Sequence, residues 1–271
     1  MSSPLQAKPD EPVPFVISGV VVNSGSAKLV NRFVETLSVE SGYPMKPVYV
    51  KSYAELSKIL REKPNSIGWT CGAPYVQDRL KDGQQLISIP LFNNKPLYSS
   101  LIISHKEDPR KSLAEFKDKV FAYSDPRSNS GFVAPTYHLW SQGIDIKNHF
   151  RLLLHAGNHE RSIEAMAHGL ADVAAIDEYV WVDYIKQHPD TARSLHEIER
   201  LGPFPFTPIV AGRLVDKKII NNLQTILINL DKNKQGKLLL EAFGFDGFVI
   251  KEPEFYQPIQ KMMETINRQL Q

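Results

Sequence analysis

The chain has 271 residues, of which 42% are hydrophobic and 23% charged, a composition typical of a globular protein with a sizeable core. Its net charge of +2 and the lack of any run of basic residues argue against nucleic acid as a partner. A single cysteine, Cys71, excludes an internal disulfide framework and a cysteine-based zinc cluster. Since Cys71 stands among apolar residues, we expect a small buried side chain there.

The first 13 residues are expected to form a flexible N-terminal segment. Residues 1–14 contain four prolines and lack the apolar core of a secretory signal, so this start resembles a mature terminus. If the protein is exported, we expect that its secretory signal has been replaced by Met1 in this sequence. No stretch approaches the roughly 20 apolar residues that a membrane span needs.

The first part of the chain alternates β-rich runs with helical stretches. The runs are Phe15–Val22, Lys46–Val50, Ser66–Thr70 and Leu86–Leu91, and the helical stretches are Ala27–Glu40, Tyr53–Arg61 and Pro74–Leu80. This order predicts a parallel sheet with helices on its faces.

A second series follows Asn93 to Pro96. Its strands are Tyr98–Ser104, Val120–Tyr123, Phe150–Leu154 and Val173–Ile176, and its helices are Ser112–Phe116, Gly131–Ser141, Glu160–His168 and Glu178–Gln187. A proline-spaced stretch, Pro203–Pro208, leads to a short strand, Ile209–Arg213, and to helices at Val215–Leu230, Lys234–Phe243 and Glu254–Gln271.

Two α/β series joined near residues 92–98 and 204–210 predict two lobes, because the chain crosses out and then returns. We expect residues 14–95 with 211–271 in the first lobe and residues 96–210 in the second. Each lobe is predicted to hold a mostly parallel sheet flanked by helices, with the two crossover strands as a hinge. Ligands bind at the carboxyl ends of strands in such sheets, so the loops after the strands are the places to search for a site.

The turn from Ser124 to Gly131 is the most informative of these loops. It ends an apolar strand and opens a helix, so several free N–H groups of the first helical turn would point at one place and favour an oxyanion. Ser128 and Ser130 can add hydroxyl donors, and Gly131 lets a ligand approach the backbone. The alternative is that Ser128 or Asn129 only caps the helix.

His159 follows the next predicted strand and precedes a helix. We expect its imidazole to face the cleft, donate to an anionic oxygen and change its charge with the charge of the ligand. A metal site shared with His155 and a plain surface or capping histidine are the alternatives, although Gly157 between the two histidines and the lack of an HExxH pattern argue against metal.

Two carboxylates, Asp177 and Glu178, follow a β-rich run. They can serve acid–base catalysis or bind an ammonium group, and Asp177 can equally cap the helix that starts at Glu178. Tyr53, Tyr75 and Tyr98 can place phenol groups in the cleft, the alternative being half-buried packing. The sequence shows no convincing nucleophile, metal set or cofactor motif.

Together these segments resemble the phosphate/phosphite/phosphonate substrate-binding proteins of ABC transporters, which have the type II periplasmic-binding-protein fold. The matching landmarks run in family order over roughly residues 14–250. They are Gly68–Val76, Tyr98–Ile103, Ser124–Gly131, His159, Gly169–Ala175 and the Pro205–Pro208 return.

The resemblance implies roles for single residues. Ser128, Asn129, Ser130 and His159 match positions that grip phosphoryl oxygens, and Tyr53 and Tyr98 match aromatic cleft positions. Family members that take aminoalkyl phosphonates carry an acidic residue in the return stretch, where this chain has Thr207. Glu178, or less well Asp177, matches the other carboxylate of that ammonium pocket.

The function we expect is a binding protein, not an enzyme, that closes on a small phosphonate, phosphate or related ester. It would need no cofactor or metal, act as a monomer and deliver its ligand to the membrane permease of an ABC transporter. This implies a periplasmic or extracellular, membrane-tethered location. A ligand-sensing domain of a signalling system and a small-molecule enzyme on the same scaffold are the alternatives.

Overall fold

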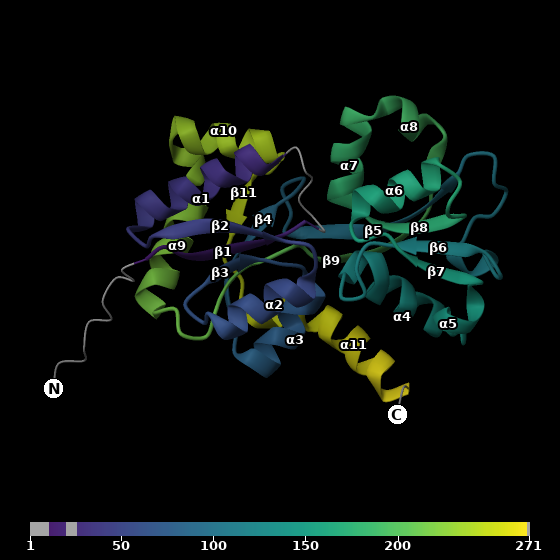
Figure 1. The fold of residues 1–271 in the computed structure, drawn as a ribbon, viewed down its shortest axis with the longest axis horizontal. Coiled ribbons are helices and arrows are strands. Elements are labelled where there is room, and N and C mark those ends of the chain that lie inside the picture. Colours follow the sequence, from purple (N-terminus) through teal and green to yellow (C-terminus); the bar gives the residue numbers. More distant parts are fainter. Residues whose placement is uncertain (1–10, 20–25, 270–271) are drawn as a thin grey trace.

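Two lobes, each built around one β-sheet, lie side by side along the longest axis of the molecule (Figure 1). The computed structural model describes residues 11–19 and 26–269. The first sheet has the strand order β11-β4-β10-β3-β1-β2, and the second has the order β7-β6-β8-β5-β9. The chain therefore leaves the first sheet after β4 and returns to it at β10.

The strands lie close to the runs that the sequence predicts. The first sheet contains β1 (Val13–Ser18), β2 (Met45–Val50), β3 (Ile67–Trp69), β4 (Gln85–Leu91), β10 (Ile209–Ala211) and β11 (Gly247–Val249). The second contains β5 (Leu97–His105), β6 (Val120–Tyr123), β7 (Leu152–His155), β8 (Val173–Asp177) and β9 (Leu195–Pro205). Because β10 starts at residue 209, residues 209 and 210 join the first sheet, just before the expected lobe boundary.

The predicted two-lobed α/β fold is confirmed, but the sheets are mixed and not mostly parallel. β1 pairs in parallel with β2 and β3, and β6 pairs in parallel with β7 and β8. The strands with which the chain enters a sheet from the other lobe run the other way, since β5 is antiparallel to β8 and β9, and β10 is antiparallel to β3 and β4. β11 is also antiparallel to its neighbour β4. Two parallel neighbours need a long crossover connection, usually a helix, and a strand that enters a sheet directly from the other lobe lacks one.

Helices cover both faces of each sheet. In the first lobe α1 (Ala27–Ser41), α9 (Lys217–Ile228) and α10 (Lys234–Phe243) pack together, while α2 (Tyr53–Glu62) and α3 (Gly72–Asp82) form a second layer. In the second lobe α6 (His159–Ala167), α7 (Glu178–Gln187) and α8 (Pro189–Arg193) lie on one side, and α4 (Ala134–Trp140) and α5 (Ile146–His149) on the other (Figure 1).

Shorter turns complete the chain. They are the π-helical turn η3 (Asn129–Val133) and the 3₁₀ turns η2 (Leu113–Glu115), η4 (Leu230–Lys232) and η5 (Pro253–Tyr256). The last helix, α11 (Gln257–Gln269), packs against both α3 and α4 and thus touches both lobes.

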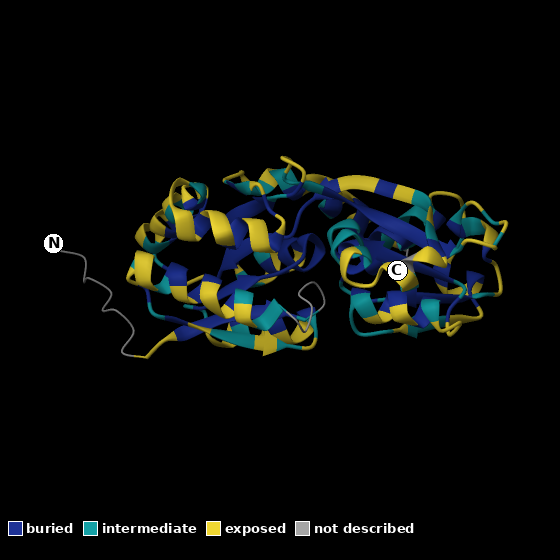
Figure 2. Cartoon of the chain, turned by 90° about the horizontal axis from the view of Figure 1, so that it is seen from above, coloured by how far each residue is buried: buried dark blue, intermediate teal, exposed yellow. Residues whose placement is uncertain are grey.

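Apolar spacing and caps explain why these helices form. In α1 the residues Val30, Phe33, Val34 and Leu37 recur at helical intervals and are buried on one face. Gly42 ends α1 with a φ of 62°, a left-handed conformation that glycine adopts without a Cβ clash. Figure 2 shows the outcome for the whole chain, with buried strands inside each lobe and exposed residues on the outer helix faces.

Two strands were missed by the sequence prediction. β9 contains Pro203 and Pro205, which favour an irregular connection, yet β9 is an edge strand, where proline is tolerated because one side of the backbone needs no partner. β11 has only three residues and therefore too short an apolar pattern. Residues 20–22 of the first predicted strand, residues 1–10 of the N-terminal segment and residues 270–271 of the last helix lie outside the described residues.

Candidate functional site

Five segments that follow carboxyl ends of strands meet where the two lobes face each other. From the second lobe come the turn after β6, the start of α6 after β7, and the start of α7 after β8. From the first lobe come the starts of α2 and α3, after β2 and β3. Because the parallel strands of one sheet end at the same edge, this topology collects polar loop residues at the lobe interface.

The serine-rich turn folds as the π-helical turn η3. The Ser128 hydroxyl accepts a hydrogen bond from the Gly131 N–H at 3.0 Å, so Ser128 caps the turn as the alternative reading proposed. The amides of Phe132 and Val133 both donate to the Ser128 carbonyl. The side chains of Ser128, Asn129 and Ser130 are fully buried in this arrangement.

The expectation of several free backbone amides in this turn is wrong. The Gly131 N–H is bound to Ser128, and the Asn129 N–H lies 3.4 Å from the Cys71 sulfur. The unpaired donor of the turn is the Ser130 hydroxyl, whose Oγ has no partner of hydrogen-bond geometry among residues 11–19 and 26–269 but lies beside the Asp177 carboxyl and the Tyr98 hydroxyl. An anion at this turn would therefore be bound mainly by hydroxyl groups.

His159 faces the turn from the first position of α6. Its Nε2 lies 3.3 Å from the Ser124 Oγ and 3.4 Å from the Ser128 Oγ. The Asp177 N–H donates to Nδ1 at 3.2 Å, which leaves the ring proton on Nε2, facing the hydroxyls. Asn158 fixes this position because its side chain caps α6 by accepting from the Arg161 N–H.

Burial decides the charge of His159. It lowers the pKa of this imidazole to about 3, so the ring is neutral at physiological pH. The expectation that its charge follows the charge of the ligand stays a prediction. His155 does not join it, since its exposed ring stacks on Tyr123, and the described residues contain no group of three or more potential metal ligands.

Gly131 marks how closely three segments approach. A Cβ at this position would collide with the Ser124 Oγ and would lie 3.1 Å from the Ser128 Oγ and 3.3 Å from the His159 Cε1. Only glycine thus lets the end of β6, η3 and α6 converge. Ser124 was part of the predicted turn but was not singled out as a site residue.

The phenol of Tyr98 and the thiol of Cys71 lie beside Asn129 of the turn. The Asn129 Nδ2 donates to the Tyr98 hydroxyl at 3.1 Å, and the Cys71 sulfur lies 3.9 Å from the same oxygen. The Tyr53 hydroxyl is buried without a partner in the described part of the chain. Burial raises the pKa of Tyr53, Tyr98 and Cys71, so all three are neutral.

The side chains of the two adjacent acidic residues, Asp177 and Glu178, lie in different surroundings. Glu178 accepts from the Ser99 N–H at 2.9 Å and pairs with Arg200 at 2.5 Å, so its side chain is held by β5 and β9. Asp177 instead lies beside the Ser130 hydroxyl and caps α7 by accepting from the Tyr179 N–H. Burial raises the pKa of Asp177 to about 7. The structure thus brings Asp177, and not Glu178, to the other candidates.

Tyr75 and Thr207 make their contacts elsewhere. The Tyr75 ring packs on Tyr256 with centroids 4.9 Å apart, and the Thr207 hydroxyl accepts from the Trp69 indole at 3.3 Å. Both side chains are fully buried. Their proposed contacts with a ligand stay predictions.

The same turn also joins the two lobes. Asp125 Oδ2 accepts from the Tyr53 N–H at the start of α2, and Arg127 pairs with Asp78 of α3 at 2.7 Å and donates to Ser57 of α2 at 2.5 Å. We call these five residues the clasp. The sequence analysis missed it, because the partners of Arg127 are 49 and 70 residues away.

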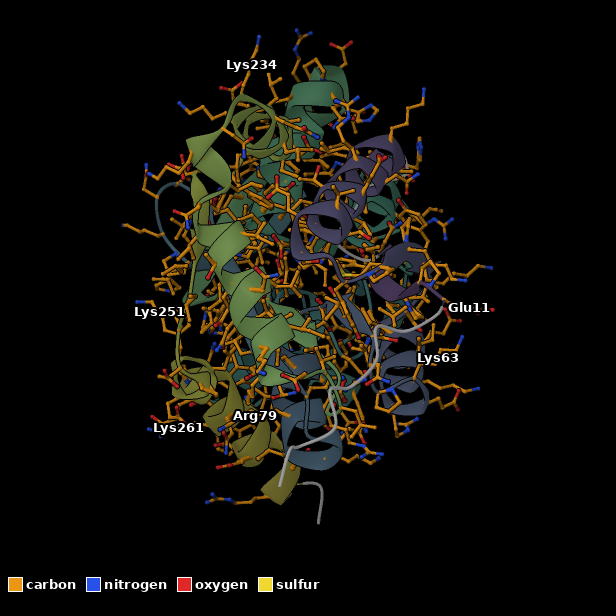
Figure 3. The ribbon with its side chains drawn as sticks, turned by 90° about the vertical axis from the view of Figure 1, so that its left-hand side faces the viewer. Glu11, Lys63, Arg79, Lys234, Lys251 and Lys261 are labelled. Atoms are coloured by element: carbon orange, nitrogen blue, oxygen red, sulfur yellow. The ribbon has the colours of Figure 1, made fainter. Side chains whose placement is uncertain are left out.

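The cluster carries no built-in positive charge. We define the hydroxyl cluster as Ser124, Ser128, Asn129, Ser130, His159 and Asp177. No lysine or arginine belongs to it, and charged side chains such as Lys63, Lys234 and Lys261 project outward from the molecule (Figure 3).

In the described part of the chain, no helix is long and apolar enough to span a membrane.

Comparisons with known proteins agree with this architecture. Residues 23–256 match the family model described as "ABC transporter, phosphonate, periplasmic substrate-binding protein". The chain is 24% identical to the probable ABC transporter phosphite binding protein PhnD1 of Prochlorococcus marinus, with 89% of this chain and 85% of that protein covered. It is 25% identical to the phosphonates-binding periplasmic protein of Escherichia coli, with coverage of 85% and 69%.

Solved structures show the same fold. Prochlorococcus marinus PhnD1 in complex with methylphosphonate has a TM-score of 0.85 at 22% identity, with 95% of this chain and 98% of that chain covered. A binding protein component of an ABC phosphonate transporter from Pseudomonas aeruginosa also has a TM-score of 0.85 at 22% identity, with coverage of 94% and 86%. The chain therefore belongs to the family of periplasmic substrate-binding proteins of phosphonate ABC transporters.

Proposed function

We propose that this chain binds a small phosphonate or related oxyanion between its lobes, at the hydroxyl cluster. The observation that carries this proposal is the Ser130 Oγ, which is fully buried and has no partner of hydrogen-bond geometry in the described chain. The neutral His159 points its Nε2–H at the Ser124 and Ser128 hydroxyls of the same turn. Buried polar groups are normally paired, so the unpartnered Ser130 hydroxyl is available to donate to an oxyanion. The relatives named for phosphite and phosphonates point to a phosphorus oxyanion.

Neutral donors are sufficient for useful affinity. Each hydrogen bond to a charged oxygen contributes about 1.5–3 kcal/mol, and a micromolar dissociation constant corresponds to about 8 kcal/mol. Three or four such bonds from Ser130, His159 and the neighbouring hydroxyls cover that range after the cost of ordering.

Calorimetry with methylphosphonate tests the proposal. Ser130→Ala should weaken binding about tenfold, because one hydroxyl donor is lost. Ser88→Ala is the matched control, since the Ser88 Oγ is also buried and unpartnered but lies in β4 of the first sheet. Equal affinity of the Ser130 variant and the wild type would contradict the assignment.

We also propose that the site does not catalyse a reaction. The lone pair of His159 Nδ1 is bound to the Asp177 N–H, so this histidine cannot act as a general base without losing that bond. The raised pKa of Cys71 keeps its thiol protonated and weakly nucleophilic. Release of product from methylphosphonate or from phosphate esters by the pure protein would overturn this view.

The partner we propose is the membrane permease of an ABC transporter, with the protein acting as a periplasmic, membrane-tethered monomer. Two lobes held together by a clasp present a different surface to a permease when they separate. Light scattering of the pure protein tests the monomer, and a ligand-dependent complex with permease in detergent tests the partner.

A further inference from the structure

Asp177 has a carboxyl oxygen that forms no hydrogen bond of normal geometry. Its Oδ1 accepts the Tyr179 N–H at 2.9 Å, whereas its Oδ2 has no partner of hydrogen-bond geometry in residues 11–19 and 26–269, although the Ser130 hydroxyl lies close enough to lower the pKa of this carboxyl. The side chain is 1% exposed and lies beside the Ser130 hydroxyl, which is also unpartnered. An anion that contacts the Ser130 Oγ therefore lies next to the Asp177 carboxyl.

An ionised carboxylate in this position would repel the anion. Within the described chain Asp177 forms no ion pair, so no cation offsets the repulsion. Two acidic oxygens at hydrogen-bond distance in a buried site stay together when one proton lies between them, as in a carboxylate dyad. A ligand oxygen that reached the Oδ2 of Asp177 would form such a pair.

We propose that Asp177 and an oxygen of the bound anion share one proton, so that this carboxyl selects which anions bind and at which pH. The inference rests on the proposed oxyanion function. A phosphonate has a second acidic hydrogen that leaves near neutral pH, so it can bring the proton itself. A sulfonate has no such hydrogen, so it binds only when Asp177 is protonated.

The other titratable groups around Asp177 cannot take this proton instead. They are Tyr53 on α2, Cys71 before α3, Tyr98 on β5, His159 on α6, and Glu178 and Tyr179 on α7. The phenols and the thiol are already protonated. Glu178 is paired with Arg200, and protonation of His159 Nδ1 would turn its hydrogen against the Asp177 N–H. Burial, which raises the pKa of Asp177 to about 7, agrees with the assignment.

The test compares methylphosphonate with methanesulfonate, which have similar shapes and differ in the acidic hydrogen. Calorimetry in two buffers of different ionisation enthalpy counts the protons taken up on binding. At about pH 8 the wild type should take up close to one proton per methanesulfonate, and its affinity should fall about tenfold per pH unit above about pH 7. Its affinity for methylphosphonate should pass through a maximum near neutral pH.

Asp177→Asn should bind methanesulfonate without proton uptake and with a flat pH profile, because the amide donates a hydrogen at any pH. Asparagine also caps helices well, so α7 should persist. Asp216→Asn is the matched control, since Asp216 caps α9 in the same way outside the site. Binding by the wild type without proton uptake, or uptake retained in Asp177→Asn, would overturn this inference alone. If neither anion binds between about pH 5 and 9, the proposed function fails as well.

Discussion

His159 and Asp177 have pKa shifts of opposite sign, and each shift links folding to pH. The pKa of His159 falls from 6.5 to about 3, so the unfolded chain binds more protons between these values and stability rises with pH. The pKa of Asp177 rises from 3.8 to about 7, so the folded chain binds more protons there and stability falls with pH. Between pH 3.8 and 6.5 the two contributions offset each other.

Removing one of the two groups should expose the contribution of the other. Between about pH 4 and 6, the stability of His159→Gln should fall with pH relative to the wild type by about 1.4 kcal/mol per pH unit, and that of Asp177→Asn should rise by a similar amount. Urea unfolding at a series of pH values measures both slopes. Curves parallel to that of the wild type would show that these groups titrate normally in the folded protein.

Gly131 offers a second prediction at the residue scale. Gly131→Ala should abolish measurable methylphosphonate binding and destabilise the fold, because the new Cβ would push Ser124, Ser128 and His159 apart. Gly143→Ala is a useful contrast, since that Cβ would meet nothing within 4 Å, although its φ of 76° adds backbone strain. Thermal unfolding and calorimetry separate the two effects. Normal binding by Gly131→Ala would show that the three segments can move apart at little cost.

At the level of elements, the clasp links the serine-rich turn to α2 and α3. Arg127 and Asp78 are largely buried, with 21% and 5% of their side chains exposed, so loss of either partner leaves an unpaired charge. The clasp should therefore favour the arrangement in which the lobes touch, and a ligand that binds only that arrangement gains apparent affinity.

Arg127→Gln should weaken methylphosphonate binding ten- to a hundredfold, although Arg127 is not part of the hydroxyl cluster. Small-angle scattering should show a larger radius of gyration for the unliganded variant than for the wild type. Arg79→Gln is the control, because Arg79 pairs with the exposed Glu254 within the first lobe. Unchanged affinity and scattering would mean that the clasp does not affect the lobe equilibrium.

The sequence predicted the helices and strands better than the contacts between residues that lie far apart in the chain. Strand ends after β6, β7 and β8 were found because apolar runs stop at polar turns, and these ends contain Ser130, His159 and Asp177. The choice between Asp177 and Glu178 could not be made, because it depends on which residue caps α7 and which one reaches Arg200. Cys71 and Arg127 were missed because their significance comes from the opposite lobe.

At the scale of the whole molecule, binding to the folded state must raise its stability. Methylphosphonate at about a hundredfold its dissociation constant should add about 2.7 kcal/mol to the free energy of unfolding. A thermal-shift series over ligand concentration checks this, with Ser130→Ala requiring about tenfold more ligand for the same shift. No shift at saturating ligand would contradict binding at the folded interface.

The clasp residues Asp125 and Arg127 lie within the same six consecutive residues as Ser130, for which we propose anion binding. Any motion that pulls this short segment away from α2 and α3 would therefore also displace the hydroxyls of the proposed site. The ligand should then dissociate from the free protein no faster than the contacts of the clasp break. A permease that separates the lobes would therefore release the ligand at the same time.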